Sequence, residues 1–270
     1  MKASLFVTTY ELPQHLELVC AGLARQSCRE FEVLFCDDGS SPETAKIIQR
    51  FAQASQIQTQ HIWQEHQGFR KCRILNRAIP QSTGPVLIFL DGDCIPHRDF
   101  IQDHLDEQEE GFYLAGRRLE LGPKISAQLT PERVTLGFFD RPQAEVLWSS
   151  LTGDSAHFNR SIHMRSRWLR NLFKMNHIVD LKGCNYSVPR HHIEAINGFD
   201  ESYEGYGRED TDVEIRLQNL GLKIKSMKGL ALQFHVWHPK RDFTPANDER
   251  LDELKQTRRF RCKTGLIKDP

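Results

Sequence analysis

The sequence predicts an α/β fold: a single domain, residues 1–270, built on a doubly wound, mostly parallel β-sheet. Through the first hundred residues, short apolar runs alternate with amphipathic stretches of helical period, and this alternation is typical of βαβ units. With 270 residues, 39% of them hydrophobic, the chain is long enough to bury one large core. We therefore expect helices on both faces of the sheet.

Each element of this alternation can be placed from its residues. Strands are expected at SLFVTTY, FEVLFCDDGS, TQHIWQE and PVLIFLDGD, and helices at PQHLELVCAGLARQ, PETAKIIQRFAQAS and RKCRILNRAI. Pro42 suits the first turn of the second helix. HRDFIQDHLDEQ then predicts a helix and GFYLAGRR a strand, whereas residues 120–180 show no regular alternation. That segment is expected to be an irregular insertion.

Composition limits the class of function and the compartment. Lys plus Arg equal Asp plus Glu at 36 each, so no overall basic field points to nucleic acid. The 7 cysteines form no CxxC pair, which is typical of reduced thiols in the cytosol. No run approaches the roughly 20 apolar residues of a spanning helix, and the first residues lack the features of a signal peptide. We expect a cytoplasmic protein, soluble or on a membrane surface.

Carboxylates follow two of the expected strands. Ligands of doubly wound sheets bind beyond the carboxyl ends of strands, where strand order reverses. PVLIFL ends in Asp91, Gly92 and Asp93, whose two carboxylates repel each other unless a cation lies near them, and Mg²⁺ and Mn²⁺ prefer oxygen ligands. Asp37 and Asp38 follow the earlier strand and could accept hydrogen bonds from a nucleobase or a ribose. In both places the alternative is an ordinary turn.

Basic groups and histidines form further candidates. The helix in QGFRKCRILNRA carries cations that could neutralise a diphosphate or simply face water: Arg70, Lys71, Arg73 and Arg77, with Asn76 among them. His235 and His238 follow a strand-like run in QFHVWHP and could complete a metal site, although a histidine in a strand is often only packed and hydrogen-bonded.

Two later stretches stand out. Glu209, Asp210 and Asp212 crowd the start of a predicted helix after a glycine-rich turn, although helix capping needs only one such residue. Residues 160–174, RSIHMRSRWLRNLFK, carry five Arg or Lys and no acid among apolar side chains. This segment is predicted either to dock on anionic lipid or a charged acceptor, or to be a solvated helix packed by one face.

Together these motifs carry a resemblance. SLFVTTYE, FCDDGS, QGFRKCRILNRAI and LDGD resemble the nucleotide-sugar half of inverting GT-A glycosyltransferases, a family that includes chondroitin and hyaluronan synthases. The GCN.S, NGFDE and G.G.ED.D elements resemble the acceptor-side segment of galactosyltransferase-like and chondroitin-polymerase-like members. The resemblance implies a Rossmann-like GT-A domain with a nucleotide-sugar half over 1–100, an acceptor and catalytic half over 101–245, and a C-terminal helix over 246–270.

The resemblance also implies roles for individual residues. Asp210 would be the general base, and Glu209 would hold the acceptor or orient the base. Mn²⁺ or Mg²⁺ would be held by Asp93 and His235, with His238 as the second choice. The donor would contact Thr8, Thr9, Tyr10, Glu11, Asp37, Asp38, Gly68, Arg70, Asn76, Asp91 and Gly92. The acceptor would contact Gly183, Asn185, Tyr206 and Asp212.

The functional hypothesis is therefore metal-dependent, inverting transfer of a sugar from a UDP-sugar to a hydroxyl of a glycan or lipid-linked glycan, in bacterial surface polysaccharide or lipopolysaccharide synthesis. One alternative is a nucleotidyltransferase or sugar-phosphate pyrophosphorylase, but VTTYELPQH lacks the glycine-rich basic loop usual after their first strand. Another is a non-catalytic carbohydrate-binding module, against which the retention of Asp210 beside an intact DGD counts.

Overall fold

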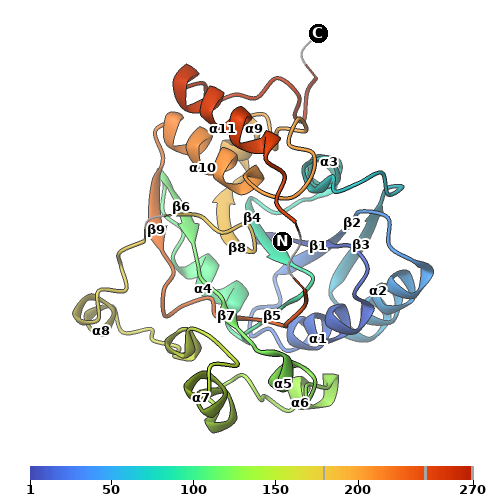
Figure 1. Ribbon diagram of the computed structural model, residues 1–270, viewed down its shortest axis with the longest axis vertical. Helices are drawn as coiled ribbons and strands as arrows, with labels where there is room; N and C mark the ends of the chain where they lie inside the picture. Colours follow the sequence, from blue (N-terminus) through green and yellow to red (C-terminus); the bar gives the residue numbers. More distant parts are fainter. Residues whose placement is uncertain (179, 240–241, 269–270) are drawn as a thin grey trace.

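A mixed β-sheet runs through the middle of the protein, and a small second sheet lies beside it (Figure 1). The computed structural model describes residues 1–178, 180–239 and 242–268. Within these residues the large sheet has seven strands in the order β3-β2-β1-β4-β8-β6-β9, and the small one has the order β5-β10-β7. The strands are β1 (Ala3–Thr9), β2 (Phe31–Asp37), β3 (Gln58–Trp63), β4 (Val86–Asp91), β5 (Cys94–Pro96), β6 (Phe112–Ala115), β7 (Leu119–Glu120), β8 (Asn185–Pro189), β9 (Lys223–Ser226) and β10 (Gln233–His235).

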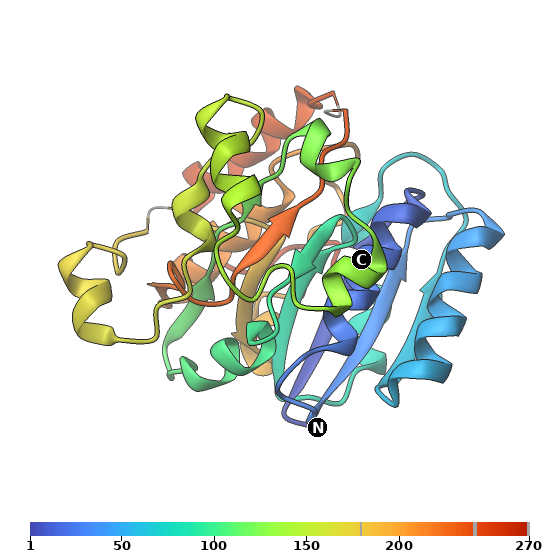
Figure 2. The same cartoon turned by 90° about the horizontal axis from the view of Figure 1, so that it is seen from below.

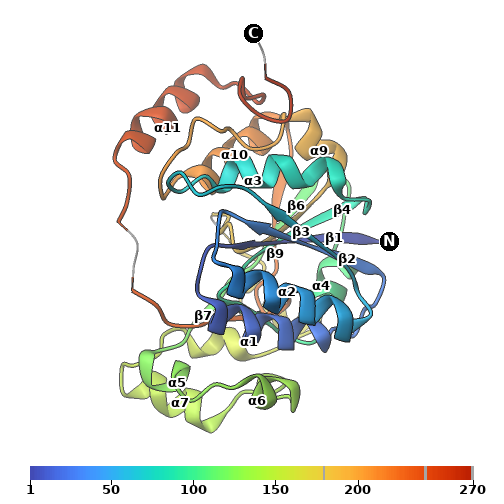
Figure 3. The same ribbon diagram turned by 90° about the vertical axis from the view of Figure 1, so that its right-hand side faces the viewer.

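Helices cover both faces of the large sheet, as Figure 3 shows, with α1, α2 and α4 on one side and α3, α9 and α10 on the other. The helices are α1 (Pro13–Ala24), α2 (Pro42–Ser55), α3 (Lys71–Ala78), α4 (Phe100–Asp106), α5 (Pro123–Ser126), α6 (Pro131–Thr135), α7 (Ala144–Leu151), α8 (Arg167–Leu172), α9 (Arg190–Ala195), α10 (Glu209–Asn219) and α11 (Ala246–Thr257), with 3₁₀ turns η1 (Ile79–Gln81) and η2 (Phe158–Ser161). The predicted α/β class with a mostly parallel sheet is confirmed.

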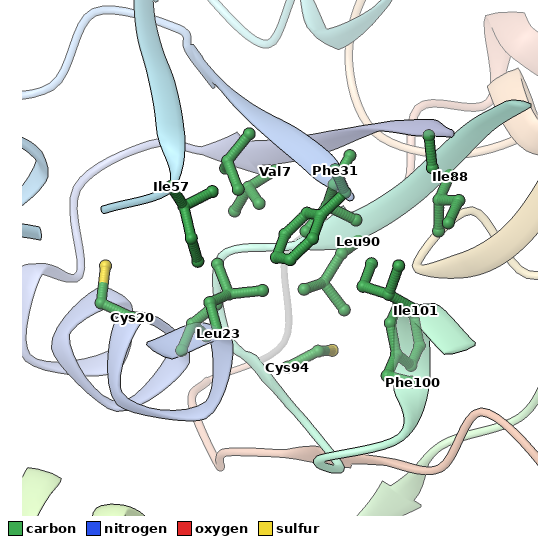
Figure 4. Packing of buried hydrophobic residues seen from close by; sticks show 14 of the residues in the cluster. Val7, Cys20, Leu23, Phe31, Ile57, Ile88, Leu90, Cys94, Phe100 and Ile101 are labelled. Atoms are coloured by element: carbon green, nitrogen blue, oxygen red, sulfur yellow. The ribbon is translucent and has the colours of Figure 1, made fainter. Parts of the chain in front are cut away.

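The core explains why these residues form these elements. In β1 and β2 nearly every residue is buried, as expected for parallel strands covered on both faces. Val7, Phe31 and Leu90 pack from three neighbouring strands against Leu23 of α1 and Phe100 of α4 (Figure 4). Burying a large apolar side chain contributes about 1.5–3 kcal/mol, so this cluster holds the strand order in place.

The strand order reverses beside β1, which pairs in parallel with β2 on one side and β4 on the other. Thr8 is therefore the register partner of Asp91, and the Gly92 amide N–H donates a hydrogen bond to the Thr8 carbonyl oxygen at 2.8 Å. The loops after β1 and β4 meet at this point, which is where open α/β sheets bind ligands.

The small sheet brings three distant segments together. In β10, His235 is the register partner of Cys94 in β5 and of Glu120 in β7. Because Cys94 directly follows Asp93, this pairing places His235 beside the Asp93 loop. Ile95 and Phe234 of this sheet belong to an apolar cluster that also includes Leu18 of α1 and Val146 of α7, and this cluster holds the sheet in place.

The segment from 120 to 180 is the irregular part of the molecule, as expected, although it contains short helices that the sequence pattern did not reveal. Figure 2 shows α7 and α8 as separate short helices at the edge of the molecule, and the chain between them includes the 3₁₀ turn η2. The predicted C-terminal helix over 246–270 is too long, because α11 ends at Thr257 and Arg258 adopts a left-handed conformation with φ 51°. Residues 269–270 lie outside the described residues.

All seven cysteines are buried and unpaired, in agreement with the predicted reduced thiols. Among the described residues, we find no helix with the length and apolar character that crossing a bilayer requires.

Candidate active site

A cleft of about 1280 Å³ opens at the carboxyl ends of β1 and β4. Its lining comes from segments far apart in the chain, which the two sheets and the start of α10 bring together. Predicted site residues on its walls are Thr8, Thr9, Tyr10, Asp38, Asp91, Asp93, Gly183, Tyr206, Glu209, Asp210, His235 and His238. The carboxylates expected to face one another across the site thus line one cavity.

Lys71 lies between the ends of β1 and β4 and the acids at the start of α10. The Thr8 hydroxyl donates to Asp91 Oδ1 at 2.7 Å, and Lys71 Nζ donates to the same oxygen at 2.9 Å. Burial opposes the charge of Lys71, but the carboxylates of Asp91 and Glu209 raise its pKa. The ammonium therefore stays charged and neutralises part of the carboxylate crowd.

Asp38 and Tyr10 line the cleft directly after the ends of β2 and β1. Both Asp38 oxygens accept hydrogen bonds, Oδ1 from the Gln64 amide at 2.6 Å and Oδ2 from the Arg70 backbone N–H at 2.7 Å. The Tyr10 ring stacks on His66 with centroids 4.1 Å apart. The result is a rigid rim with a flat aromatic side chain, suited to a planar ligand group.

Asp93, His235 and His238 line the cleft as one compact cluster. Asp93 Oδ2 lies 3.1 Å from His238 Nε2 and 3.8 Å from His235 Nε2, and the two Nε2 atoms are 3.2 Å apart. The other ring nitrogen of His235, Nδ1, lies 2.8 Å from Glu120 Oε2. Glu120 therefore orients His235 so that Nε2 faces the cluster.

This cluster fits a small divalent cation. Two ligands about 2.1 Å from one ion and at right angles to each other lie about 3.0 Å apart, close to the spacing of these atoms. The Glu120 contact at Nδ1 fixes the tautomer that leaves Nε2 of His235 available as a ligand. Burial raises the pKa of Asp93, but the hydrogen bond from His238 and the charge of His235 lower it overall, so the carboxylate is ionised.

A second His and Asp cluster, His97, Asp99 and His163, lacks these features. The Asp99 backbone N–H donates to His97 Nδ1 at 3.1 Å, so the ring proton of His97 lies on Nε2. The Asp99 carboxylate already forms a salt bridge with Arg165, with Oδ2 3.4 Å from Nη2. None of the three lines the cleft.

The start of α10 contributes Glu209 and Asp210 to the lining of the cleft. Gly207 has φ 109°, and an added Cβ would lie 2.3 Å from the Phe243 ring, so only glycine fits this turn. Arg208 follows at φ 76°, and helix α10 begins at Glu209. The turn aims the first two side chains of the helix into the cleft.

Asp210 is held by backbone groups. Its Oδ2 accepts from the Gly183 amide N–H at 2.9 Å and its Oδ1 from the Thr211 amide N–H at 2.8 Å. A Cβ at Gly183 would lie 3.2 Å from the Asp210 Cβ, so a larger residue there would press on the Asp210 side chain. Burial raises the pKa of the neighbouring Glu209, and Lys71 partly offsets this.

Several predicted donor residues shape the cleft from behind instead of lining it. Asp37 is fully buried, and its two carboxylate oxygens form hydrogen bonds with the Ser40 amide N–H and with His61. The Glu11 carboxylate accepts from the backbone N–H and the hydroxyl of Ser41. The Arg70 side chain folds back on Gln67 and the Glu65 carbonyl oxygen. Gly68, in the loop between β3 and α3, and Gly92, between β4 and β5, are also outside the set of lining residues.

The side chains of three predicted contacts point elsewhere, which corrects their predicted placement. Asn76 bonds the backbone of Phe199 through both its amide nitrogen and its oxygen. Asn185 is fully buried and donates to the Arg117 and Ala231 carbonyl oxygens. Asp212 forms a buried ion pair with Arg216, with Nε to Oδ2 at 2.7 Å. Each satisfies neighbouring groups inside the fold, so the side chains hold structure together.

Sequence reasoning missed other residues of the cleft. Glu120 ends a two-residue strand, and its role appears only when β7 pairs with β10. Cations from four separate segments also line the cleft: Arg117, Arg118, Arg160, Lys182 and Lys228. The basic segment 160–174 supplies one of these cations, Arg160, and its excess of basic residues was visible in the sequence.

Two family models match the chain. The one described as "Glycosyl transferase family 2" matches residues 4–171, and the one described as "N-terminal domain of galactosyltransferase" matches residues 165–239. The two matches divide the chain in the same order as the two halves expected from the motifs.

Curated relatives agree with these matches. The chain is 26% identical to an uncharacterized glycosyltransferase, YfnE, of Bacillus subtilis (strain 168), over 97% of this chain and 70% of that protein. It is 21% identical to the chondroitin synthase of Escherichia coli, over 88% of this chain. The chain spans 35% of the length of that synthase and 52% of a validoxylamine A glucosyltransferase of Streptomyces hygroscopicus subsp. jinggangensis.

Solved structures show the same fold. The structure of TarS 1-349 from S. aureus in complex with UDP-GlcNAc superposes with a TM-score of 0.64 at 16% identity, over 96% of this chain and 66% of that one. The mannosyltransferase PcManGT of Pyrobaculum calidifontis, in complex with GDP-Man and Mn²⁺, gives a TM-score of 0.60 at 16% identity, over 90% and 58%. Fold, cleft and sequence matches agree: the chain belongs to glycosyl transferase family 2 and has the GT-A fold.

Proposed function

We propose that this chain transfers a sugar from a nucleoside diphosphate sugar, preferably a UDP-sugar, to a hydroxyl of a glycan acceptor, with inversion at the anomeric carbon. The observation that carries the proposal is that the Asp210 carboxylate and the Asp93, His235 and His238 cluster line the same cleft. One group accepts a proton from the incoming alcohol, and the other lies where the diphosphate would depart.

Asp210 supplies the general base. Its Oδ2 already accepts one backbone hydrogen bond from Gly183, and a second lone pair remains for the acceptor hydroxyl. Since the carboxylate is fixed by two backbone groups, the acceptor oxygen would be held in line with the anomeric carbon. A single displacement of this kind inverts the anomeric centre.

Asp93, His235 and His238 would hold a divalent cation, Mn²⁺ or Mg²⁺. When bound, such an ion neutralises the charge that develops on the leaving diphosphate. Glu120 keeps His235 in the ligating tautomer, and Asp93 remains ionised beside the two histidines. On the donor side, Thr8 and Lys71 hold Asp91 in one orientation for the ribose.

Names of relatives support the substrate class. One is a validoxylamine A glucosyltransferase, one a chondroitin synthase, and the superposed TarS structure contains UDP-GlcNAc. We propose a bacterial surface polysaccharide or lipopolysaccharide as the product and the cytoplasmic face of the membrane as the location.

The test combines donor binding with turnover. A panel of nucleotide sugars with Mn²⁺ should raise the melting temperature for the preferred donor, because a ligand that binds only the folded state stabilises it. Asp210→Asn should retain that shift and lose about 10²–10⁴-fold in donor turnover. Asp252→Asn, an exposed change on α11, should leave both unchanged. Normal turnover in Asp210→Asn, or no shift with any donor, would contradict the proposal.

We further propose that residues 160–174 contact an anionic membrane. Trp168, Leu172 and Phe173 on and after α8 are 60–69% exposed. The structure reduces the predicted basic face of this segment, because Arg160, Arg165 and Arg170 form contacts within the protein and only Arg167 and Lys174 stay at the exposed end. Apolar insertion would therefore contribute more than charge.

Sedimentation with vesicles containing phosphatidylglycerol tests this contact. Replacing Trp168, Leu172 and Phe173 together by Ser should lower binding at least about tenfold, since each large side chain contributes on the order of 1 kcal/mol or more when buried. Trp63→Ser is the matched control, because Trp63 is 49% exposed on β3. Equal loss in the control, or no loss in the triple variant, would remove this contact from the proposal.

A further inference from the structure

Four cations form one side of the cleft, and we call them the basic wall: Arg117, Arg160, Lys182 and Lys228. Arg117, Lys182 and Lys228 lie in the loops after β6, α8 and β9, and Arg160 lies in the 3₁₀ turn η2. None of them belongs to the predicted donor or metal residues.

One carboxylate serves two of these cations. Asp180 accepts from the Arg117 guanidinium and, through Oδ2, from Lys182 Nζ at 2.8 Å. Burial raises the pKa of Asp180, but the hydrogen bond from Lys182 and the charge of Arg117 lower it overall, so Asp180 is ionised. Among the salt bridges of the described residues, Asp180 is the acid that pairs with the wall, whereas Glu120, which also lines the cleft, pairs with Arg118 and His235.

The other two cations are satisfied only by carbonyl oxygens. Arg160 Nη1 donates to the Arg118 carbonyl oxygen at 2.8 Å, and Lys228 Nζ donates to the His177 carbonyl oxygen at 2.7 Å. Burial and the charge of Arg117 lower the pKa of both groups. Asp180, and for Arg160 also Glu120, oppose this lowering without reversing it, so the positive charges of the wall exceed their internal counter-charges, and an external anion would relieve the repulsion.

The wall is joined to the base side of the cleft. Lys182 directly precedes Gly183, whose N–H donates to Asp210 at 2.9 Å. Asp38, Asp91 and Asp93 line the same cleft from the ends of β2 and β4. An anion bound at the wall would thus lie on the side from which the acceptor approaches.

We propose that the basic wall is an anion subsite that binds a phosphate or carboxylate group of the acceptor, next to the hydroxyl that Asp210 deprotonates. This inference rests on the proposed function and names its acceptor class: an acidic glycan or a phosphate-linked one. Arginine forks and lysine ammonium groups both bind oxyanions through charge-assisted hydrogen bonds, so several cations on one face suit either group.

The experiment uses the full chain saturated with UDP and Mg²⁺, so that the donor side is occupied. Methyl phosphate, glucuronate and neutral glucose are then titrated, and the shift in melting temperature gives each apparent affinity. We expect methyl phosphate or glucuronate, and not glucose, to add a further shift. The stronger of the two distinguishes a phosphate-linked acceptor from an acidic sugar.

Variants of the basic wall test whether the anion-induced shift in melting temperature depends on its cations. Arg160→Gln and Lys228→Gln should each weaken the anion about tenfold and leave the UDP shift intact, because removing one charged partner of an oxyanion costs about 1.4 kcal/mol. Lys46→Gln, an exposed change on α2, is the matched control. The melting temperature without ligand checks that each variant is folded.

The outcomes separate the two proposals. If UDP with Mg²⁺ gives no shift, the proposed donor site is wrong. If UDP stabilises the protein but neither anion adds to it, or both wall variants respond like wild type, the anion subsite is wrong. A loss of UDP affinity in Arg160→Gln and Lys228→Gln would reassign the wall to the donor diphosphate and would also overturn the subsite.

Discussion

Lys71 Nζ donates a hydrogen bond to Asp91 Oδ1 at 2.9 Å and is the cation that faces the carboxylates of both cleft walls. Asp91 ends β4, whereas Glu209 and Asp210 begin α10, and all three raise the pKa of Lys71. The ammonium thus connects the donor side to the base side. Without it, these three acids would lose the cation on which all three act.

Lys71→Gln should therefore lower both stability and activity. Loss of a buried charge that offsets several carboxylates is expected to cost about 1–3 kcal/mol, reduced here because the side chain is 15% exposed. Donor turnover should fall at least about tenfold, since Asp91 loses one of its two side-chain donors. Denaturant unfolding and donor hydrolysis measure the two effects. An unfolding free energy equal to that of Lys46→Gln would contradict this role.

The metal cluster gives a graded series. His238→Gln and Asp93→Asn each remove a proposed ligand and should abolish the stabilisation by Mn²⁺, measured as a shift in melting temperature without nucleotide. Glu120→Gln removes only the orienting contact on His235 Nδ1 and should weaken Mn²⁺ about 10–100-fold. If Glu120→Gln and wild type bind Mn²⁺ equally, Glu120 has no orienting role. Chelation with EDTA should reproduce the ligand variants in wild-type protein.

Strand ends were the most predictable part of the site. Thr8, Asp91 and Asp93 follow apolar runs that read as buried parallel strands, and parallel strands deliver their carboxyl ends to one edge of the sheet. The start of α10 was marked by three acids where one cap suffices, and the family resemblance then singled out Asp210 among them. Local sequence rules reach these positions because a single strand or helix fixes each one.

Other positions depend on tertiary contacts that no local pattern contains. Asn185 and Asp212 are polar residues within motifs, but only the packed structure reveals that one amide bonds buried carbonyls and that one carboxylate pairs with Arg216. Glu120 enters the site through a β-bridge to a strand more than a hundred residues away. The basic wall has the same origin, because its cations lie on loops that converge only after folding.

Asp212 gives a direct test of that distinction. The Asp212 and Arg216 side chains are at most 1% exposed, and the Arg216 guanidinium also donates to the Ile196 and Gly198 carbonyl oxygens. Asp212→Asn should leave a buried charge without its partner and cost about 3–5 kcal/mol of unfolding free energy. Turnover per folded molecule, measured well below the melting temperature, should stay within about twofold of wild type. A normal stability with impaired acceptor use would instead return Asp212 to the acceptor site.

His104 predicts the acid sensitivity of the fold. The Asn185 amide nitrogen donates to two carbonyl oxygens, so its Oδ1 faces His104 Nε2 and accepts from it at 3.2 Å. Gln108 donates to Ser187 Oγ at 2.7 Å, so the Ser187 hydroxyl is free to donate to His104 Nδ1 at 2.9 Å. Both ring nitrogens are thus matched to the neutral imidazole, and protonation at Nδ1 would break the contact with Ser187.

Burial lowers the pKa of His104 to about 4 from an ordinary value of 6.5. Between these two values the unfolded chain binds a proton that the folded protein does not, so stability rises with pH and is lost as the pH falls from 6.5 toward 4. The loss amounts to about 3 kcal/mol, since one pKa unit corresponds to about 1.4 kcal/mol. Denaturant unfolding at pH 7, 5 and 4, with EDTA present, should give a smaller acid loss in His104→Gln than in wild type. Because carboxylates titrate alike in both proteins, the difference isolates His104, and parallel curves would show that folding does not lower the pKa of His104.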